Sequence, residues 1–204
     1  MFRVGVLVSG GGTNLQAILD AVEAGSLPVE IAVVISNRPD AYALERARRH
    51  GVPTVVVPLA DYPGRKSHEA AVARELERAR VDLVVLAGYD RIARHAVLTA
   101  YSGRIINIHP ALLPAFAGTL HAQEAALAYG VKISGCTVHF VTEEVDCGPI
   151  VVQRAIEVHE DDTVDSLKAR ILAEEHRALP EAIRLIAARR TQIEGRRVVI
   201  SPEG

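Results

Sequence analysis

Hydrophobic residues in the first half of the chain form short continuous runs, separated by stretches with helical spacing. The continuous runs predict strands, which fall at residues 2–8, 30–35, 53–57, 81–87 and 104–109. Apolar positions three and four apart predict helices at residues 14–24, 41–50 and 66–80. Gly51 is placed to end the second helix. Strands that are apolar throughout are buried on both faces, so this order indicates a parallel sheet with helices on both sides.

The pattern changes after residue 131, where longer segments alternate between hydrophobic and polar positions. Alternation predicts strands at residues 132–141 and 150–158, and it is typical of antiparallel pairs. A long helix is predicted at residues 165–189, and residues 192–200 can form a hairpin that turns at Gly195. Because the sequence contains no repeats, low-complexity segments or obvious linkers, it indicates one continuous fold.

Composition narrows the classes of function. The chain has 204 residues, of which 49% are hydrophobic, enough for a large buried core. Its formal net charge is −2 and it has no basic run, so neither nucleic acid nor an anionic membrane is an expected partner. Cys136 and Cys147 lie eleven residues apart without a C-x-x-C motif, which argues against a zinc site. No signal peptide or membrane-length run is found, so we expect a cytoplasmic protein.

The first connection, Ser9 to Asn14, places three consecutive glycines between a strand and a helix. Glycines let the backbone approach an anion, and the helix N-terminus, which Thr13 or Asn14 can cap, offers N–H groups and a positive dipole end. The loop lacks the Gly-Lys-Ser/Thr of a Walker A motif, and Leu15 stands where a dinucleotide fingerprint has its third glycine. A monophosphate site therefore suits the loop better than NAD. The alternative is a plain turn between strand and helix.

Three residues carry the candidate chemistry. Asn107 and His109 lie two apart in an apolar run, so in a strand their side chains point to the same face. Asp146 lies in a turn-like segment just before another apolar run. An amide donor, a titratable imidazole and an orienting carboxylate suit acyl chemistry at a carbonyl. The alternative is that Asn107 and His109 merely end a strand and bond to nearby backbone groups.

The chain resembles the phosphoribosylglycinamide formyltransferase family, folate-dependent enzymes of purine synthesis. The resemblance covers nearly the whole chain and rests on residues 8–16, 36–38, 45–47, 84–89, 107–114, 135–141 and 146–150. An Asn-x-His-Pro segment with a downstream Asp-x-Gly-Pro is highly specific for formyl-folate enzymes as a group. The glycine-rich opening and residues 174–176, Glu-Glu-His, narrow the resemblance to this family.

The resemblance implies an α/β fold with a Rossmann-like, mostly parallel sheet, helices on both faces and an antiparallel C-terminal extension. Residues 1–204 would form a single formyltransferase domain, with a nucleotide-binding half at 1–103 and a catalytic and folate-binding half at 104–204. The implied reaction transfers a formyl group from 10-formyltetrahydrofolate to the amine of glycinamide ribonucleotide, without a metal. A monomer or a homodimer is expected.

The resemblance also assigns roles to residues. Asn107 would donate its amide N–H to the developing oxyanion, and His109 would stabilise that oxyanion as imidazolium and help to move protons. Asp146 would raise the imidazole pKa, orient the ring and relay the amine proton. The residues implied for the nucleotide are Gly12, Thr13, Asn14, Leu172 and Glu175. Those implied for the folate are Arg65, Asp90, Arg91, Ile92, Ala93, Asn107, Thr142, Glu143, Glu144, Val145 and Asp146.

Other features bear on these expectations. The family usually has an apolar residue where Asp90 stands, and an acid there could alter folate affinity. His139 is expected to point inward from its predicted strand, close to the candidate site, and is interpreted as a core histidine, with a catalytic part as the alternative. Among rival relatives, formyltetrahydrofolate hydrolase carries an extra N-terminal domain, whereas the first predicted strand here begins at Phe2. Methionyl-tRNA formyltransferase has Arg-Gly after its Leu-Leu-Pro, whereas residues 115–118 here read Ala-Phe-Ala-Gly. A non-enzymatic nucleotide-binding module explains the glycine-rich loop but not the three candidate catalytic residues.

Overall fold

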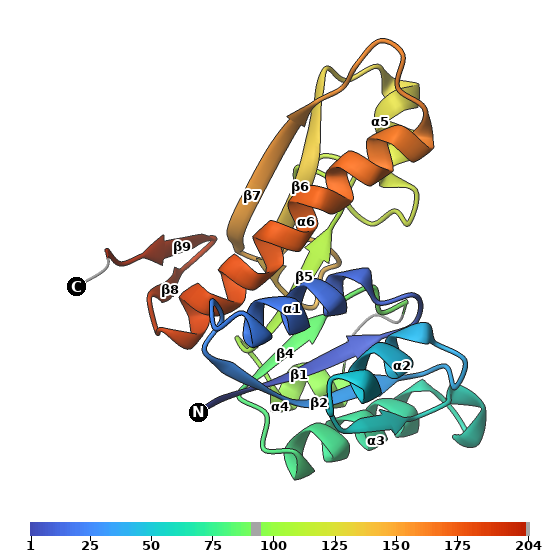
Figure 1. Ribbon diagram of the computed structural model, residues 1–204, viewed down its shortest axis with the longest axis vertical. Coiled ribbons are helices and arrows are strands. Elements are labelled where there is room, and N and C mark those ends of the chain that lie inside the picture. The colour runs from blue at the N-terminus through green and yellow to red at the C-terminus, as the bar shows by residue number, and fades with distance from the viewer. Residues whose placement is uncertain (91–94, 203–204) are drawn as a thin grey trace. The chain divides into compact units, whose positions relative to one another are not determined.

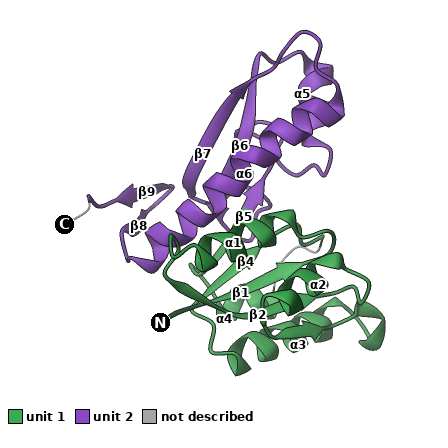
Figure 2. Ribbon diagram, viewed as in Figure 1, with its two compact units in different colours: residues 1–107 green, residues 108–204 purple. Residues whose placement is uncertain are grey.

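The computed structural model of the chain describes residues 1–90 and 95–202. The chain divides into two compact units, residues 1–107 and residues 108–204, which Figure 2 shows in green and purple. Each unit is described by itself below. That residues 1–103 and 104–204 act as the two halves of a single formyltransferase domain stays a prediction.

Unit 1 alternates strands and helices, as the hydrophobic pattern predicts (Figure 1). In chain order, its elements are β1 (Phe2–Val8), α1 (Thr13–Glu23), β2 (Val29–Ser36), α2 (Tyr42–Arg49), β3 (Thr54–Val56), η1 (Leu59–Asp61), α3 (Arg65–Arg78), β4 (Leu83–Leu86), α4 (His95–Ala100) and β5 (Ile105–His109), whose last two residues belong to unit 2. The strands lie in the order β3-β2-β1-β4-β5, and every neighbouring pair is parallel. The carboxyl ends of these strands therefore meet at one edge of the sheet.

Helices cover both faces of this sheet. Connections between parallel strands are right-handed, so the helices before and after the reversal of strand order lie on opposite faces. In agreement with this, α1 packs beside α2, and α3 packs beside α4. The strands between these layers are buried on both sides, and Val6, Val34 and Val84 have no solvent exposure at all. Their continuous apolar runs are explained by this two-sided burial.

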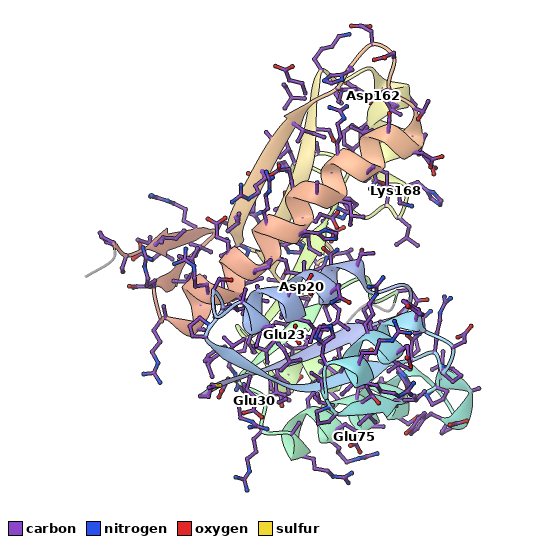
Figure 3. The ribbon with its side chains drawn as sticks, viewed as in Figure 1. Asp20, Glu23, Glu30, Glu75, Asp162 and Lys168 are labelled. Carbon is purple, nitrogen blue, oxygen red and sulfur yellow. The ribbon has the colours of Figure 1, made fainter. Side chains whose placement is uncertain are left out.

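Unit 2 contains α5 (Ala122–Tyr129), β6 (Ile133–Phe140), β7 (Ile150–Glu157), α6 (Val164–Ala187), β8 (Thr191–Glu194) and β9 (Arg197–Ile200). Strands β6 and β7 are antiparallel, as are β8 and β9, while β9 meets β7 in a parallel bridge. Helix α6 packs on β6 and β7 with a buried face that includes Leu167, Ile171 and Ile183. The helix begins at a capping box, in which the Thr163 hydroxyl accepts from the Ser166 N–H at 3.2 Å. In Figure 3, Asp162 lies at this same end of α6.

The predicted fold class is confirmed: an α/β fold with a mostly parallel sheet, helices packed on it and antiparallel C-terminal strands. Three short helices, η1, α4 and α5, were missed by the hydrophobic pattern. Each has eight residues or fewer, so apolar positions have little room to repeat with helical spacing. The expectation that Thr13 or Asn14 caps α1 is wrong, because both lie inside the first turn and the N-cap residue is Gly12.

Candidate active site

His109 ends strand β5 and is almost fully buried, with 5% of its surface exposed. Its Nδ1 lies 3.4 Å from Oδ2 of Asp146, and its Nε2 lies 2.9 Å from the carbonyl oxygen of Phe116. Both ring nitrogens therefore face acceptors. A neutral ring can donate to only one of these acceptors, whereas the imidazolium can donate to both.

The backbone around Asp146 is held in an uncommon conformation. Asp146 has φ of +54°, a region that side chains other than glycine enter at a cost of roughly 1–3 kcal/mol. Two residues later, a Cβ added to Gly148 would lie 1.7 Å from the Phe140 carbonyl oxygen, so only glycine lets the chain pass the end of β6. The Gly118 N–H donates to Oδ2 of Asp146 at 2.9 Å. These contacts fix the carboxylate beside His109.

His139 is the third ionisable group of this cluster. It is 2% exposed on β6, and its Nδ1 donates to the Phe140 carbonyl oxygen at 2.9 Å. Its Nε2 lies 3.5 Å from Oδ1 of Asp146. His139 is therefore buried and close to the candidate catalytic carboxylate, as predicted, and a catalytic part for it stays a prediction. Its inward position on an alternating strand was the available sequence signal.

Burial and charge act in opposite directions on these groups. Burial lowers the pKa of His109, and although the Asp146 charge and the Phe116 carbonyl raise it, the net value lies below the ordinary 6.5. The expected raising effect of Asp146 is present, but burial outweighs it. For Asp146, burial favours a higher pKa, yet the hydrogen bonds from His139 and the Gly118 N–H, with the charge of His109, hold its pKa below the usual value. The carboxylate thus stays ionised beside a histidine that is mostly neutral near pH 7.

Asn107 lies two residues before His109 on the same strand. The alternation of side chains along a strand puts both on one face of β5. Asn107 is half-buried, and it is paired in register with Leu86 of β4. Asn107 and His109 thus lie on one strand, as the sequence predicts.

In unit 1, the glycine-rich loop ends at Gly12, which has φ of +71° and immediately precedes α1. No side chain caps the helix there, so the first-turn N–H groups receive no hydrogen bond from a capping side chain. A Cβ on Gly12 would lie 2.5 Å from the Cβ of Ala43, so the loop also packs directly against α2. Thr13 and Asn14 form the start of α1, and Asn14 is buried. This arrangement suits an anion at the helix N-terminus.

Asp90, beyond the end of β4, joins a polar network at the same edge of the sheet. Its Oδ1 accepts from Ser9 Oγ at 3.1 Å and from Asn37 Nδ2 at 2.9 Å, and its Oδ2 pairs with Arg38. Its own N–H donates to Ser9 Oγ at 2.9 Å. Burial favours a raised pKa for Asp90, but the hydrogen bonds from Asn37, Arg38 and Ser9 hold the pKa below its usual value. The negative charge of the Asp90 carboxylate is therefore balanced by Arg38 within unit 1.

The other residues implied for binding are spread over several elements. Arg65 is the exposed first residue of α3. Thr142, Glu143, Glu144 and Val145 lie between β6 and β7, ahead of Asp146. Leu172 and Glu175 lie on α6, where Glu175 is buried. Arg91, Ile92 and Ala93 lie outside the described residues. Binding roles for all of them stay predictions.

The described part of the chain comprises residues 1–90 and 95–202. Within those ranges, no cluster of three or more His, Cys, Asp or Glu side chains could hold a metal ion. No helix in the described part of the chain is long and apolar enough to cross a membrane. Both cysteines are free thiols, and burial raises the pKa of Cys136 to about 12.

Comparison with known proteins identifies the family. The formyl transferase family model matches residues 2–183. The chain belongs to the formyl transferase family. The Asn-x-His-Pro segment, which carries the family resemblance, lies at the end of β5.

Several relatives within the formyl transferase family are close. The chain is 60% identical to the crystal structure of glycinamide ribonucleotide transformylase 1 from Symbiobacterium toebii, with a TM-score of 0.96 over 98% of this chain and 94% of that one. It is 39% identical to phosphoribosylglycinamide formyltransferase of Haemophilus influenzae, over 95% of this chain and 91% of that protein. It is 45% identical, over 90% of its length, to the trifunctional purine biosynthetic protein adenosine-3 of Drosophila melanogaster, of which it spans only 14%.

Proposed function

We propose that this chain is a phosphoribosylglycinamide formyltransferase. It transfers the formyl group of 10-formyltetrahydrofolate to the amine of glycinamide ribonucleotide, giving formylglycinamide ribonucleotide and tetrahydrofolate in de novo purine biosynthesis. The observation that carries the proposal is the buried carboxylate of Asp146, 3.4 Å from the imidazole of His109, in a chain of this family. The names of its relatives support the choice of substrates.

The reaction is an acyl transfer between two nitrogens. The glycinamide amine attacks the formyl carbon, a C–N bond forms, and the carbonyl oxygen becomes an oxyanion. The bond from that carbon to N10 of the folate then breaks, and the proton lost by the amine goes to N10. Asn107 donates its amide N–H to the oxyanion, where a fixed donor stabilises charge that exists only along the reaction path.

His109 acts as a hydrogen-bond donor that is neutral before the reaction and positively charged when the oxyanion is present. With its pKa lowered by burial, the ring is mostly neutral before reaction, and its Nε2–H is held by the Phe116 carbonyl. The substrate oxygen replaces that carbonyl as the acceptor. As the oxyanion forms, Nδ1 of His109 takes up the proton that the amine loses, and Asp146 stabilises the resulting imidazolium. The proton then passes to N10 of the folate as the bond from the formyl carbon to N10 breaks. Asp146 orients the imidazole and relays the amine proton through water.

The remaining site residues are assigned to the two substrates. Gly12, Thr13 and Asn14 hold the phosphate of the ribonucleotide, with Leu172 and Glu175 reaching the nucleotide from α6. The folate is held by Arg65, by the backbone of residues 90–93, by Asn107 and by residues 142–146. The proposal needs no metal, so activity should persist after dialysis against a chelator. A monomer or homodimer in the cytoplasm stays a prediction.

The proposal is tested by turnover with purified protein. The protein is mixed with 10-formyltetrahydrofolate, with and without glycinamide ribonucleotide, and both tetrahydrofolate and formylglycinamide ribonucleotide are measured. Formation of tetrahydrofolate and formylglycinamide ribonucleotide in equal amounts, only when glycinamide ribonucleotide is present, supports the proposal. Release of formate without the ribonucleotide would instead assign a hydrolase, and binding without turnover would assign a nucleotide-binding module.

A further inference from the structure

Helix α2 contacts the glycine-rich loop at three consecutive residues. The N–H of Ala43 donates to the Gly10 carbonyl at 3.0 Å. Nε of Arg46 donates to the Gly11 carbonyl at 2.8 Å. The Cβ of Ala43 lies so close to Gly12 that any side chain there would collide with it. One face of α2 therefore packs against the glycine-rich loop and fixes its backbone.

These contacts decide where the loop's N–H groups point. A trans peptide is planar, and its C=O and N–H point in opposite directions. Because the Gly10 carbonyl faces Ala43, the N–H of Gly11 points away from α2. Because the Gly11 carbonyl faces Arg46, the N–H of Gly12 also points away from α2. Two successive N–H groups on the side of the loop away from α2, next to the N-terminus of α1, are suited to bind an anion.

Arg46 is itself fixed from two helices. Its Nη1 donates to Oε1 of Gln16 on α1 at 3.0 Å, and its guanidinium lies 5.0 Å from the centre of the Tyr42 ring on α2. Nε2 of Gln16 in turn donates to Oδ1 of Asp20 at 2.8 Å, which sets the orientation of the Gln16 amide. A guanidinium has a rigid fork of donors, so it can hold a carbonyl of the loop and an amide of α1 at the same time.

We propose that Arg46 is a positioning residue for the phosphate of the ribonucleotide. It acts through the Gly11 carbonyl, by holding the Gly12 N–H toward the phosphate, and it places a positive charge behind the loop. This inference rests on the proposed function, because it assumes that the loop binds the phosphate of glycinamide ribonucleotide. The binding energy of a charge-assisted hydrogen bond predicts a nucleotide-specific loss of roughly tenfold to 100-fold when Arg46 is removed.

The test compares Arg46→Gln with Arg49→Gln. Arg49 lies on the same helix and contacts Glu45 and the same Tyr42 ring, but its hydrogen bonds do not reach the loop, so it is a matched control. Michaelis constants for both substrates, kcat and melting temperature are measured for each protein. Arg46→Gln should raise the Michaelis constant for glycinamide ribonucleotide about tenfold or more, with kcat and the folate constant changed less than about threefold. Arg46→Lys, which keeps the charge without the fork, should fall between the two.

A second readout separates this inference from the proposed function. Inorganic phosphate should raise the melting temperature of the parent protein and of Arg49→Gln, and should raise that of Arg46→Gln much less. That pattern without formyl transfer by the parent protein would refute the proposed function and keep the role of Arg46. An unchanged nucleotide Michaelis constant in Arg46→Gln, or equal rises for both substrates with a lower melting temperature, would overturn the role of Arg46. No stabilisation of the parent protein by phosphate would overturn it as well.

Discussion

Asp146→Asn is the most direct test of the candidate active site. The substitution keeps the size of the side chain and an oxygen that can accept the Gly118 N–H. It removes the negative charge that lies 3.4 Å from His109 Nδ1 and 3.5 Å from His139 Nε2. The fold should survive, whereas the charge that stabilises the imidazolium of His109 is lost.

The size of the effect can be bounded from the geometry. Two unit charges 3.4 Å apart interact by about 5 kcal/mol at an effective dielectric constant of about 20. Removal of a general acid–base group typically costs about 10² to 10⁴-fold in rate, which corresponds to about 3–5 kcal/mol. The two magnitudes agree because Asp146 and His109 are both shielded from water, with side-chain exposures of 10% and 6%. We therefore expect kcat to fall by about 10² to 10⁴-fold.

Steady-state and single-turnover rates would be measured together with the melting temperature. The control is Glu124→Gln, which removes a carboxylate 2.9 Å from His121, a largely exposed pair at the start of α5. That variant should keep the parental rate, because an exposed ion pair has little energetic effect. In Asp146→Asn, the acid limb of the residual rate should also move to lower pH, because loss of the charge lowers the pKa of His109 further. A well-folded Asp146→Asn with near-parental kcat would refute the assigned role.

The other predictions concern the glycine-rich loop, Asp90 and acid. Gly12→Ala should raise the Michaelis constant for the ribonucleotide by about tenfold or more and that for folate little, because its Cβ would lie 2.5 Å from the Cβ of Ala43; equal weakening of both substrates would place the phosphate elsewhere. Asp90→Met should lower the free energy of unfolding in urea by roughly 1–3 kcal/mol, because the network that includes Arg38 is lost; unchanged stability would contradict this. The pKa values of Asp90 and Asp146 are lowered, so they stabilise the fold above the unfolded value of about 4, and this contribution disappears as pH falls through the folded values. The free energy of unfolding should therefore drop below about pH 4, and the drop should be smaller in Asp146→Asn; equal drops would refute the linkage.

Much of the fold could be predicted because its strands are buried on both faces. The apolar runs of β1 and β2 match their observed bounds to within one residue, and Gly51 follows α2 with φ of +68°, as expected for a helix-ending glycine. Prediction failed where the local pattern is short. Helix α5 (Ala122–Tyr129) has only two turns, and no capping side chain marks where it begins.

The candidate site was predictable only in part. The spacing of Asn107 and His109 places both on one strand face, and the turn-like segment before the next apolar run draws attention to Asp146. The groups that hold them are backbone atoms of residues 116 and 118, which no side-chain motif reveals. The direction of the His109 pKa could not be predicted either, because it depends on how far burial outweighs the nearby charge.

Asp90 shows why a departure from the family pattern must be interpreted together with its neighbours. Taken alone, an acid in place of an apolar residue suggests repulsion of an anionic ligand. The observed strand order, β2-β1-β4, brings the carboxyl ends of three strands together, and with them Ser9, Asn37 and Arg38. Ser9, Asn37 and Arg38 lie in segments that carry the family resemblance, so the carboxylate at position 90 needs no new donor. We therefore expect the Asp90 side chain to stabilise the strand ends beside the glycine-rich loop rather than to change the affinity for folate.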